Sequence, residues 1–192
     1  MITLTDENET AMMRHYTLLL FGLLLLTVFP AQAQNSADDA YAIALERIEQ
    51  ARQNDATELD LSFNQLTLLP PEIGTLTTLQ SLYLGNNQLT SLPPEIGTLT
   101  TLQSLYLSNN QLTALPPEIG ALNNLQQLYL DNNQLTSLPP EIGALNNLQV
   151  LYMYNNQLTS LPSEIGALSN LQELLVNDPP LEAVAFHIAP RR

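Results

Sequence analysis

The sequence contains no cysteine and no lysine, and basic residues of any kind are scarce. Without cysteine, the chain cannot form a disulfide framework, a thiolate nucleophile or a zinc site built on sulfur. Its 19 acidic residues outnumber its five basic ones, and no basic residue lies between Arg52 and Arg191. This charge balance opposes binding to nucleic acid phosphates and to anionic membranes. We therefore expect a partner that is neither nucleic acid nor an anionic membrane.

Residues that typically act in catalysis or in phosphate binding are also few. Beyond residue 33 the only histidine is His187, near the C-terminus, and no G-x-S-x-G motif occurs. A Ser-His-Asp triad would need this terminal segment to reach a serine elsewhere in the chain. The glycines beyond residue 33 recur within a repeated unit rather than in a phosphate-binding loop. We predict a protein that is not an enzyme and needs no cofactor or metal.

The first 33 residues have the pattern of a signal peptide. Arg14 precedes the apolar run "TLLLFGLLLLTVF", a proline ends that run, and "AQA" supplies small residues for cleavage after Ala33. The run is shorter than the ~20 residues that span a bilayer, which disfavours the alternative of an uncleaved anchor. An acidic leader is unusual before a signal peptide, so Met12 or Met13 is a candidate true start. We predict an exported protein, secreted or held at the cell surface or in the periplasm, without stable membrane insertion after cleavage.

The remainder of the chain is dominated by an internal repeat of 23 residues. The stretch "YLGNNQLTSLPPEIGTL" at 83–99 returns as "YLSNNQLTALPPEIGAL" at 106–122. The pattern common to the units is L-x-x-L-x-L-x-x-N-Q-L-T-x-L-P-x-E-I-G-x-L-x-x. Five consecutive units and a partial sixth cover residues 56–181, as 56–78, 79–101, 102–124, 125–147, 148–170 and 171–181.

The spacing of apolar residues predicts the structure of one unit. Leu82 and Leu84 alternate as in a short strand with one buried face. Leu92, Ile96 and Leu99 follow at spacings of four and three, which suits one or two turns of α- or 3₁₀-helix that point inward. One unit alone cannot bury these side chains, whereas stacked neighbours bury them for each other. We predict a parallel sheet on one side of a curved solenoid and helical turns on the other.

This pattern resembles the leucine-rich repeat family, in the 23-residue variety whose second half reads L-P-x-x-I-x-x-L and in the style of exported bacterial members. The resemblance covers about two thirds of the chain. It implies an α/β repeat solenoid, or horseshoe, with a concave parallel sheet, short convex helical or 3₁₀ turns and a capping helix at the N-terminal end. It also implies a role in protein recognition through the concave face.

A solenoid needs capping elements at its two ends, where no further repeat covers the core. Residues 34–55 form the predicted N-terminal cap, with an amphipathic helix over 37–53. Its expected apolar stripe consists of Tyr41, Leu45, Ile48 and Ala51. The C-terminal tail, residues 182–192, offers only a short apolar run and leaves that end open to fraying or to self-association.

One asparagine recurs in every complete unit, at the corner where the strand ends. Backbone groups lose their sheet partners at such a corner, and an inward asparagine side chain offers them both a donor and an acceptor. We interpret this column as structural rather than as a ligand site. It consists of Asn64, Asn87, Asn110, Asn133 and Asn156.

The outward positions of the strands are where we expect function. Parallel strands lie ~4.8 Å apart, so four tyrosines in register should stack as an aromatic rib. Tyrosine combines large contact area with a hydroxyl and is enriched in interfaces, although it is also a good strand former. The predicted concave binding residues are Tyr83, Tyr106, Tyr129, Tyr152, Tyr154, Asp131, Asn109 and Asn132. We predict a protein partner, with a glycan as the alternative ligand.

Two alternatives concern the repeat as a whole. Near-identical units are also compatible with a structural or self-assembling surface protein that has no single ligand.

A glutamate recurs once per unit on the convex side and most simply forms a solvated face near a helix N-terminus. A ladder of divalent cations fits it less well, because calcium needs six to eight converging oxygens. These residues are Glu72, Glu95, Glu118, Glu141 and Glu164.

Overall fold

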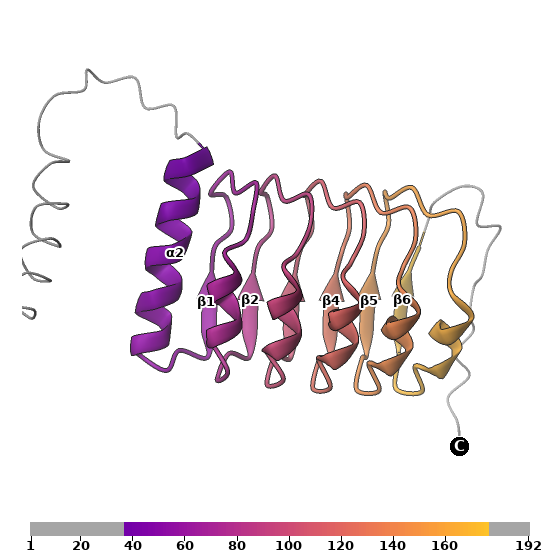
Figure 1. Ribbon diagram of the computed structural model, residues 1–192. Coiled ribbons are helices and arrows are strands. Elements are labelled where there is room, and N and C mark those ends of the chain that lie inside the picture. Colours follow the sequence, from indigo (N-terminus) through magenta and orange to yellow (C-terminus); the bar gives the residue numbers. More distant parts are fainter. Residues whose placement is uncertain (1–36, 177–192) are drawn as a thin grey trace, which may run out of the picture. The chain divides into compact units, whose positions relative to one another are not determined.

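The computed structural model describes residues 37–176, all within one compact unit, Asn35–Arg192. One α-helix, α2 (Ala37–Gln53), is followed by strands that alternate with 3₁₀ turns (Figure 1). The predicted signal peptide and the C-terminal tail lie outside the described residues. The strands are β1 (Glu58–Asp60), β2 (Ser81–Tyr83), β3 (Ser104–Tyr106), β4 (Gln127–Tyr129), β5 (Val150–Tyr152) and β6 (Glu173–Leu175). The turns are η2 (Pro71–Thr75), η3 (Pro94–Thr98), η4 (Pro117–Ala121), η5 (Pro140–Ala144) and η6 (Ser163–Ala167).

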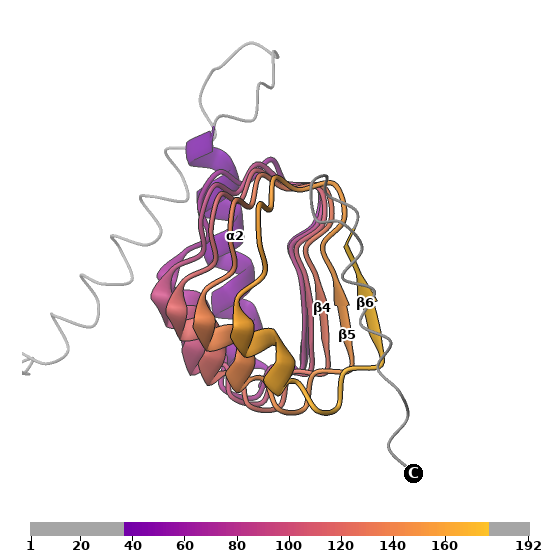
Figure 2. The same cartoon turned by 90° about the vertical axis from the view of Figure 1, so that its right-hand side faces the viewer.

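The six strands form one parallel sheet in sequence order, β1 to β6. Each strand residue pairs with the residue 23 positions further on, so that Leu82 faces Leu105 and Tyr83 faces Tyr106. The period of the sequence repeat therefore equals the offset between paired residues in neighbouring strands. Strands and 3₁₀ turns lie on opposite sides of the solenoid (Figure 2). The predicted α/β repeat solenoid is confirmed, with 3₁₀ rather than α-helical turns on the outer side.

The core runs between the sheet and the turns. The units 79–101, 102–124 and 125–147 each bury seven apolar side chains. Burial of one leucine contributes about 1.5–3 kcal/mol. No buried side-chain nitrogen or oxygen in residues 37–176 lacks a hydrogen-bond partner. In the second unit the buried residues are Leu79, Leu82, Leu84, Leu89, Leu92, Ile96 and Leu99.

The convex turns pack closely because each carries a glycine. A Cβ added at Gly120 would lie 2.7 Å from the backbone oxygen of Glu141 in the next unit. Real Cβ atoms do not come so close, so a side chain there would push the two turns apart. None of the described glycines has a positive φ, which makes the requirement one of space rather than of backbone conformation. At Gly166, in the last turn, no residue among 37–176 lies within 4 Å of such a Cβ.

Helix α2 covers the N-terminal end of the core, in the range predicted from the sequence. Its stripe differs from the prediction: Ala40 and Ala44 are buried with Ile48 and Ala51, whereas Tyr41 and Leu45 are only half-buried. Small alanines let the helix backbone lie close to the first unit, and the larger side chains flank that contact. Within residues 37–176, no helix has the length and apolar character needed to cross a membrane.

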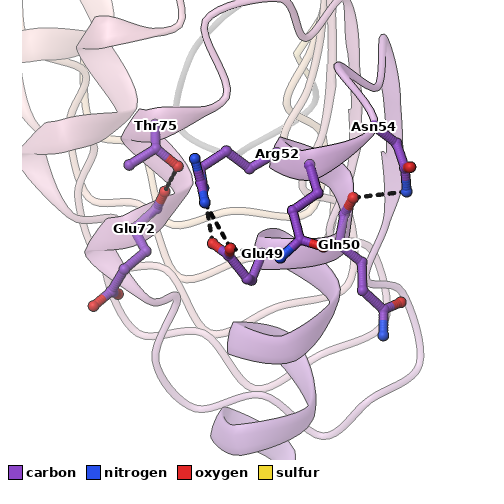
Figure 3. Close-up of polar contacts among 7 residues, drawn as sticks. Glu49, Gln50, Arg52, Asn54, Glu72 and Thr75 are labelled. Atoms are coloured by element: carbon purple, nitrogen blue, oxygen red, sulfur yellow. Dashed lines mark hydrogen bonds and ion pairs between the residues drawn. The ribbon is translucent and has the colours of Figure 1, made fainter. Parts of the chain in front are cut away.

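Local polar contacts order the C-terminal end of α2 (Figure 3). Arg52 donates two hydrogen bonds of 2.7 and 2.8 Å to the Glu49 carboxylate, which lowers the pKa of Glu49 to about 2. Asn54 donates to the backbone oxygen of Gln50 at 2.9 Å and so caps the helix. Arg47 donates to the backbone oxygen of Asp60 at 3.3 Å. This last contact reaches a carbonyl on the edge of the sheet that has no strand to pair with.

Candidate functional site

The outward side chains of the strands form the concave face, and its central feature is the tyrosine rib. We define the rib as Tyr83, Tyr106, Tyr129 and Tyr152, which occupy the last position of four successive strands. The rings of Tyr83 and Tyr106 stack with centroids 4.6 Å apart, and those of Tyr106 and Tyr129 with centroids 4.7 Å apart. These distances match the spacing of parallel strands, because the sheet register places each ring directly on the next.

The fourth ring breaks the stack. Tyr152 meets Tyr129 edge-to-face, with an interplanar angle of 87° and centroids 5.3 Å apart. Its hydroxyl donates to the Glu173 carboxylate on β6. This hydrogen bond raises the pKa of Tyr152 to about 12. The rib thus ends against a carboxylate of the last described strand.

The rib is half-buried rather than fully exposed, because each stacked ring covers a face of its neighbour. The hydroxyl of Tyr106 donates to Oε1 of Gln127 at 3.2 Å, and Ser104 donates to the same oxygen at 3.3 Å. Burial raises the pKa of Tyr129 above its ordinary value. The rib therefore presents ordered ring edges and hydroxyls to solvent rather than mobile side chains.

Asp131 lies on the concave side but is only 4% exposed, in contrast to the outward, accessible position that the sequence predicts. Its Oδ1 accepts the backbone N–H of Tyr154 at 3.2 Å, and its Oδ2 accepts the hydroxyl of Ser108 at 3.3 Å. Burial raises the pKa of Asp131 above its ordinary value. The carboxylate links three successive units, and little of its surface is left for a partner. Tyr154 itself is half-buried.

Asn109 and Asn132 adopt left-handed backbone conformations, with φ of 59° and 55°. Asn86 and Asn155 do the same in their units. Asparagine tolerates this conformation better than most residues, so the backbone alone gives a reason for asparagine here. Asn155 also donates from Nδ2 to Oδ1 of Asn132 at 2.8 Å. Sequence reasoning missed this constraint, although an asparagine that recurs at a strand-ending corner could have indicated it.

The first unit departs from this pattern at the same position. Phe63 has φ 59° and is 77% exposed, although bulky residues rarely adopt this conformation. Leu68 is 56% exposed where later units carry serine or alanine. Glu58 and Asp60, on β1, are exposed as well. These are the positions where the first unit differs from the units that follow it.

The structural asparagines bridge successive units. Oδ1 of Asn110 accepts the backbone N–H of Leu89 at 3.0 Å. Its Nδ2 donates to the backbone oxygens of Leu84 at 2.9 Å and Leu107 at 3.0 Å. Asn64 differs because no strand precedes β1, and its Nδ2 donates only locally, to the oxygen of Ser62 at 2.8 Å. The bridging arrangement recurs at Asn87, Asn133 and Asn156.

The convex glutamates lie in the first turn of each 3₁₀ segment and are exposed. Within residues 37–176, no group of three or more His, Cys, Asp or Glu side chains is arranged to hold a metal ion. The concave face is therefore the place where the described residues bring aromatic, amide and carboxylate groups together.

The chain is similar to known leucine-rich repeat proteins. The model of the leucine rich repeat family matches residues 55–112, 77–135 and 123–181. A solved leucine-rich repeat protein of Leptospira interrogans is 47% identical over 64% of this chain, with a TM-score of 0.62. A solved TDR receptor is 31% identical over 57% of the chain, with a TM-score of 0.52. The matches cover 32% and 20% of those longer chains. No curated protein sequence matches significantly.

Proposed function

Because the chain belongs to the leucine-rich repeat family, whose fold is commonly a protein-interaction module, we propose that it is an exported recognition protein. It binds a protein partner along the concave face and performs no catalysis of its own. The tyrosine rib is the contact surface, and the solenoid behind it keeps the four rings in fixed register.

One observation carries this proposal. The rib position accepts other residues without loss of the sheet, because Asp60 and Leu175 occupy it in β1 and β6 and remain paired in register. Packing therefore does not demand tyrosine there. Tyrosine nonetheless recurs on four neighbouring strands and forms an ordered aromatic surface. Aromatic residues that recur at solvent-facing positions are typical of protein interfaces.

Export is supported by the sequence pattern of residues 1–33. An acidic protein without cysteine does not depend on the redox state of the compartment that receives it. Mass spectrometry of the protein recovered outside the expressing cells tests this part: an N-terminus at Gln34 is expected. Full-length protein confined to the cell interior would contradict it.

The contact surface is tested with the double variant Tyr106→Ala/Tyr129→Ala. Its control is Gln111→Ala/Gln134→Ala, which truncates exposed side chains in the same two units. Proteins captured from secreted and cell-surface material by the parent chain should also be captured by the control and lost with the tyrosine variant. Circular dichroism must show that both variants are folded. An unchanged set of captured proteins with the tyrosine variant would contradict the proposal.

The rival function, a self-assembling surface repeat, is favoured by one observation at the C-terminal end. Gly166 keeps the space that interior glycines need for the next turn, yet no described residue fills that space. Leu175 on β6 is exposed as well. Sedimentation velocity distinguishes the two functions. A monomer over a hundredfold range of concentration favours recognition, and oligomers abolished by Leu175→Glu favour assembly.

A further inference from the structure

The charged side chains that the strands themselves carry are all acidic. Within the described residues that follow Arg52, every charged side chain is acidic. On the concave side the exposed carboxylates lie at the two ends: Glu58 and Asp60 on β1, and Glu173 on β6. The middle of the face, β2 to β4, carries neutral outward residues on its strands, with the rib at its centre. The aromatic surface is therefore flanked by negative charge at both ends.

The first end has the chemistry of a cation site. One face of the Tyr83 ring stacks on Tyr106, and on the other side Asp60 stands in register with Tyr83. Asp60 is shorter than a tyrosine and cannot cover the Tyr83 ring as another stacked ring would. A cationic side chain at this point gains both a carboxylate and an aromatic face, and the second contact is a cation–π interaction. Arg47 reaches only the backbone oxygen of Asp60.

The other end offers a different acceptor. Glu173 accepts the Tyr152 hydroxyl through one of its two oxygens. A carboxylate can accept several hydrogen bonds, so the second oxygen is able to bind an arginine or lysine while the first holds the tyrosine. From β1 to β6 the strands span about 24 Å, since five steps of ~4.8 Å separate them. An extended polypeptide covers this distance with about seven or eight residues.

We propose that the concave face binds an extended basic segment of its protein partner, about eight residues long, with a cationic residue near each end. One cation lies between Asp60, Glu58 and the face of the Tyr83 ring that is turned away from Tyr106, and the other lies at Glu173. The uncharged middle of the segment crosses Tyr106 and Tyr129. This inference rests on the proposed recognition function and specifies the chemistry of the partner.

A selection from phage-displayed random ten-residue peptides tests the proposal, with the full chain immobilised and the Tyr106→Ala/Tyr129→Ala variant as the counter-selection. The expected result is enrichment of peptides with arginine or lysine at two positions six to eight residues apart. The best peptide is then synthesised with a fluorescent label, and its Kd is measured by fluorescence polarisation at low and high salt. Binding should weaken as the salt concentration rises.

Two triple variants isolate the contribution of charge. Glu58→Gln/Asp60→Asn/Glu173→Gln removes three concave charges, and its amides keep oxygen acceptors for Ser62 and Tyr152. Glu72→Gln/Glu118→Gln/Glu164→Gln removes three convex charges and gives the same net charge. The concave variant should bind the labelled peptide about 10-fold more weakly, whereas the convex variant should change Kd less than about 2-fold.

The outcomes separate this inference from the proposed function. Peptides that need the tyrosines but show no basic enrichment, and that bind the concave triple variant equally well, would overturn the basic segment and leave recognition by the rib intact. If no peptide is selected whose capture depends on the tyrosines, the rib is not a recognition surface and both proposals fail.

Discussion

The two faces of the solenoid repeat for different reasons. On the convex side, isoleucine and glycine recur because each turn packs against the core and against the next turn, and Gly120 leaves no room for a side chain. On the concave side, the rib position tolerates Asp60 and Leu175 without loss of sheet register, yet tyrosine recurs on four strands. Repetition on the first face follows from packing. Repetition on the second face is not required by packing, and function is the explanation that we propose.

The largest effect is expected at the structural asparagines between the two faces. Asn110→Ala leaves the backbone N–H of Leu89 without its partner and removes one of the two side-chain hydrogen bonds that the oxygens of Leu84 and Leu107 each accept. It should lower the free energy of unfolding by about 3 kcal/mol. Asn64→Ala, which removes only a local hydrogen bond, should cost about 1 kcal/mol. Urea denaturation measures both. Equal losses would contradict the bridging role of Asn110.

The next effect sharpens the convex side of the comparison. Gly120→Ala should destabilise the protein by about 2 kcal/mol, because the new Cβ meets the backbone of the next turn. Gly166→Ala is its matched control and should change stability by less than about 0.5 kcal/mol, since no described residue lies within 4 Å of the new Cβ. Thermal and urea unfolding test the pair. A costly Gly166→Ala would indicate that the last turn packs against a partner, as the self-assembly function requires.

A smaller effect tests the concave side. Tyr106→Ala removes two stacked contacts and one hydrogen bond from a half-buried side chain, and should lower stability by about 1 kcal/mol. The stability loss should thus be smaller than that of Gly120→Ala. If urea denaturation showed the reverse order, the tyrosines would be part of the packing that holds the solenoid together.

The smallest effect concerns pH. Burial raises the pKa of Asp131 in the folded state above its unfolded value, so the folded state binds more protons between these two values. The free energy of unfolding therefore falls as pH rises through this interval. Asp131→Asn abolishes the pH dependence that this carboxyl group contributes. The stability of the variant relative to that of the parent should therefore be higher at pH 7 than at pH 3, by less than about 1 kcal/mol. Urea denaturation at the two pH values checks the sign, and a larger benefit at pH 3 would contradict it.

Much of the fold followed from the sequence because the repeat period equals the sheet register. Leu82 and Leu84 predicted a strand, and Leu92 with Ile96 predicted an inward turn, because stacked units can bury these residues only in one way. The apolar stripe of α2 was predicted correctly at Ile48 and Ala51 but not in the first half of the helix. Periodicity favoured the larger Tyr41 and Leu45, whereas close approach to the first unit selected Ala40 and Ala44.

The concave face was less predictable. The register predicted that the tyrosines stack, but the turned ring of Tyr152 depends on Glu173, which lies 21 residues away. The burial of Asp131 depends on Ser108 and on the backbone of Tyr154, in the units on either side. A strand pattern tells which side a residue faces. It does not tell how far the neighbouring strands cover that residue.

The role of the tyrosine rib in recognition is tested by the affinity of the Tyr106→Ala/Tyr129→Ala variant for the best selected peptide, compared with the parent chain and the Gln111→Ala/Gln134→Ala control. If the rib recurs for recognition, Kd should rise at least about 10-fold in the tyrosine variant and remain within about 2-fold in the control. A tyrosine variant that is folded and binds the peptide as tightly as the parent would contradict the claim.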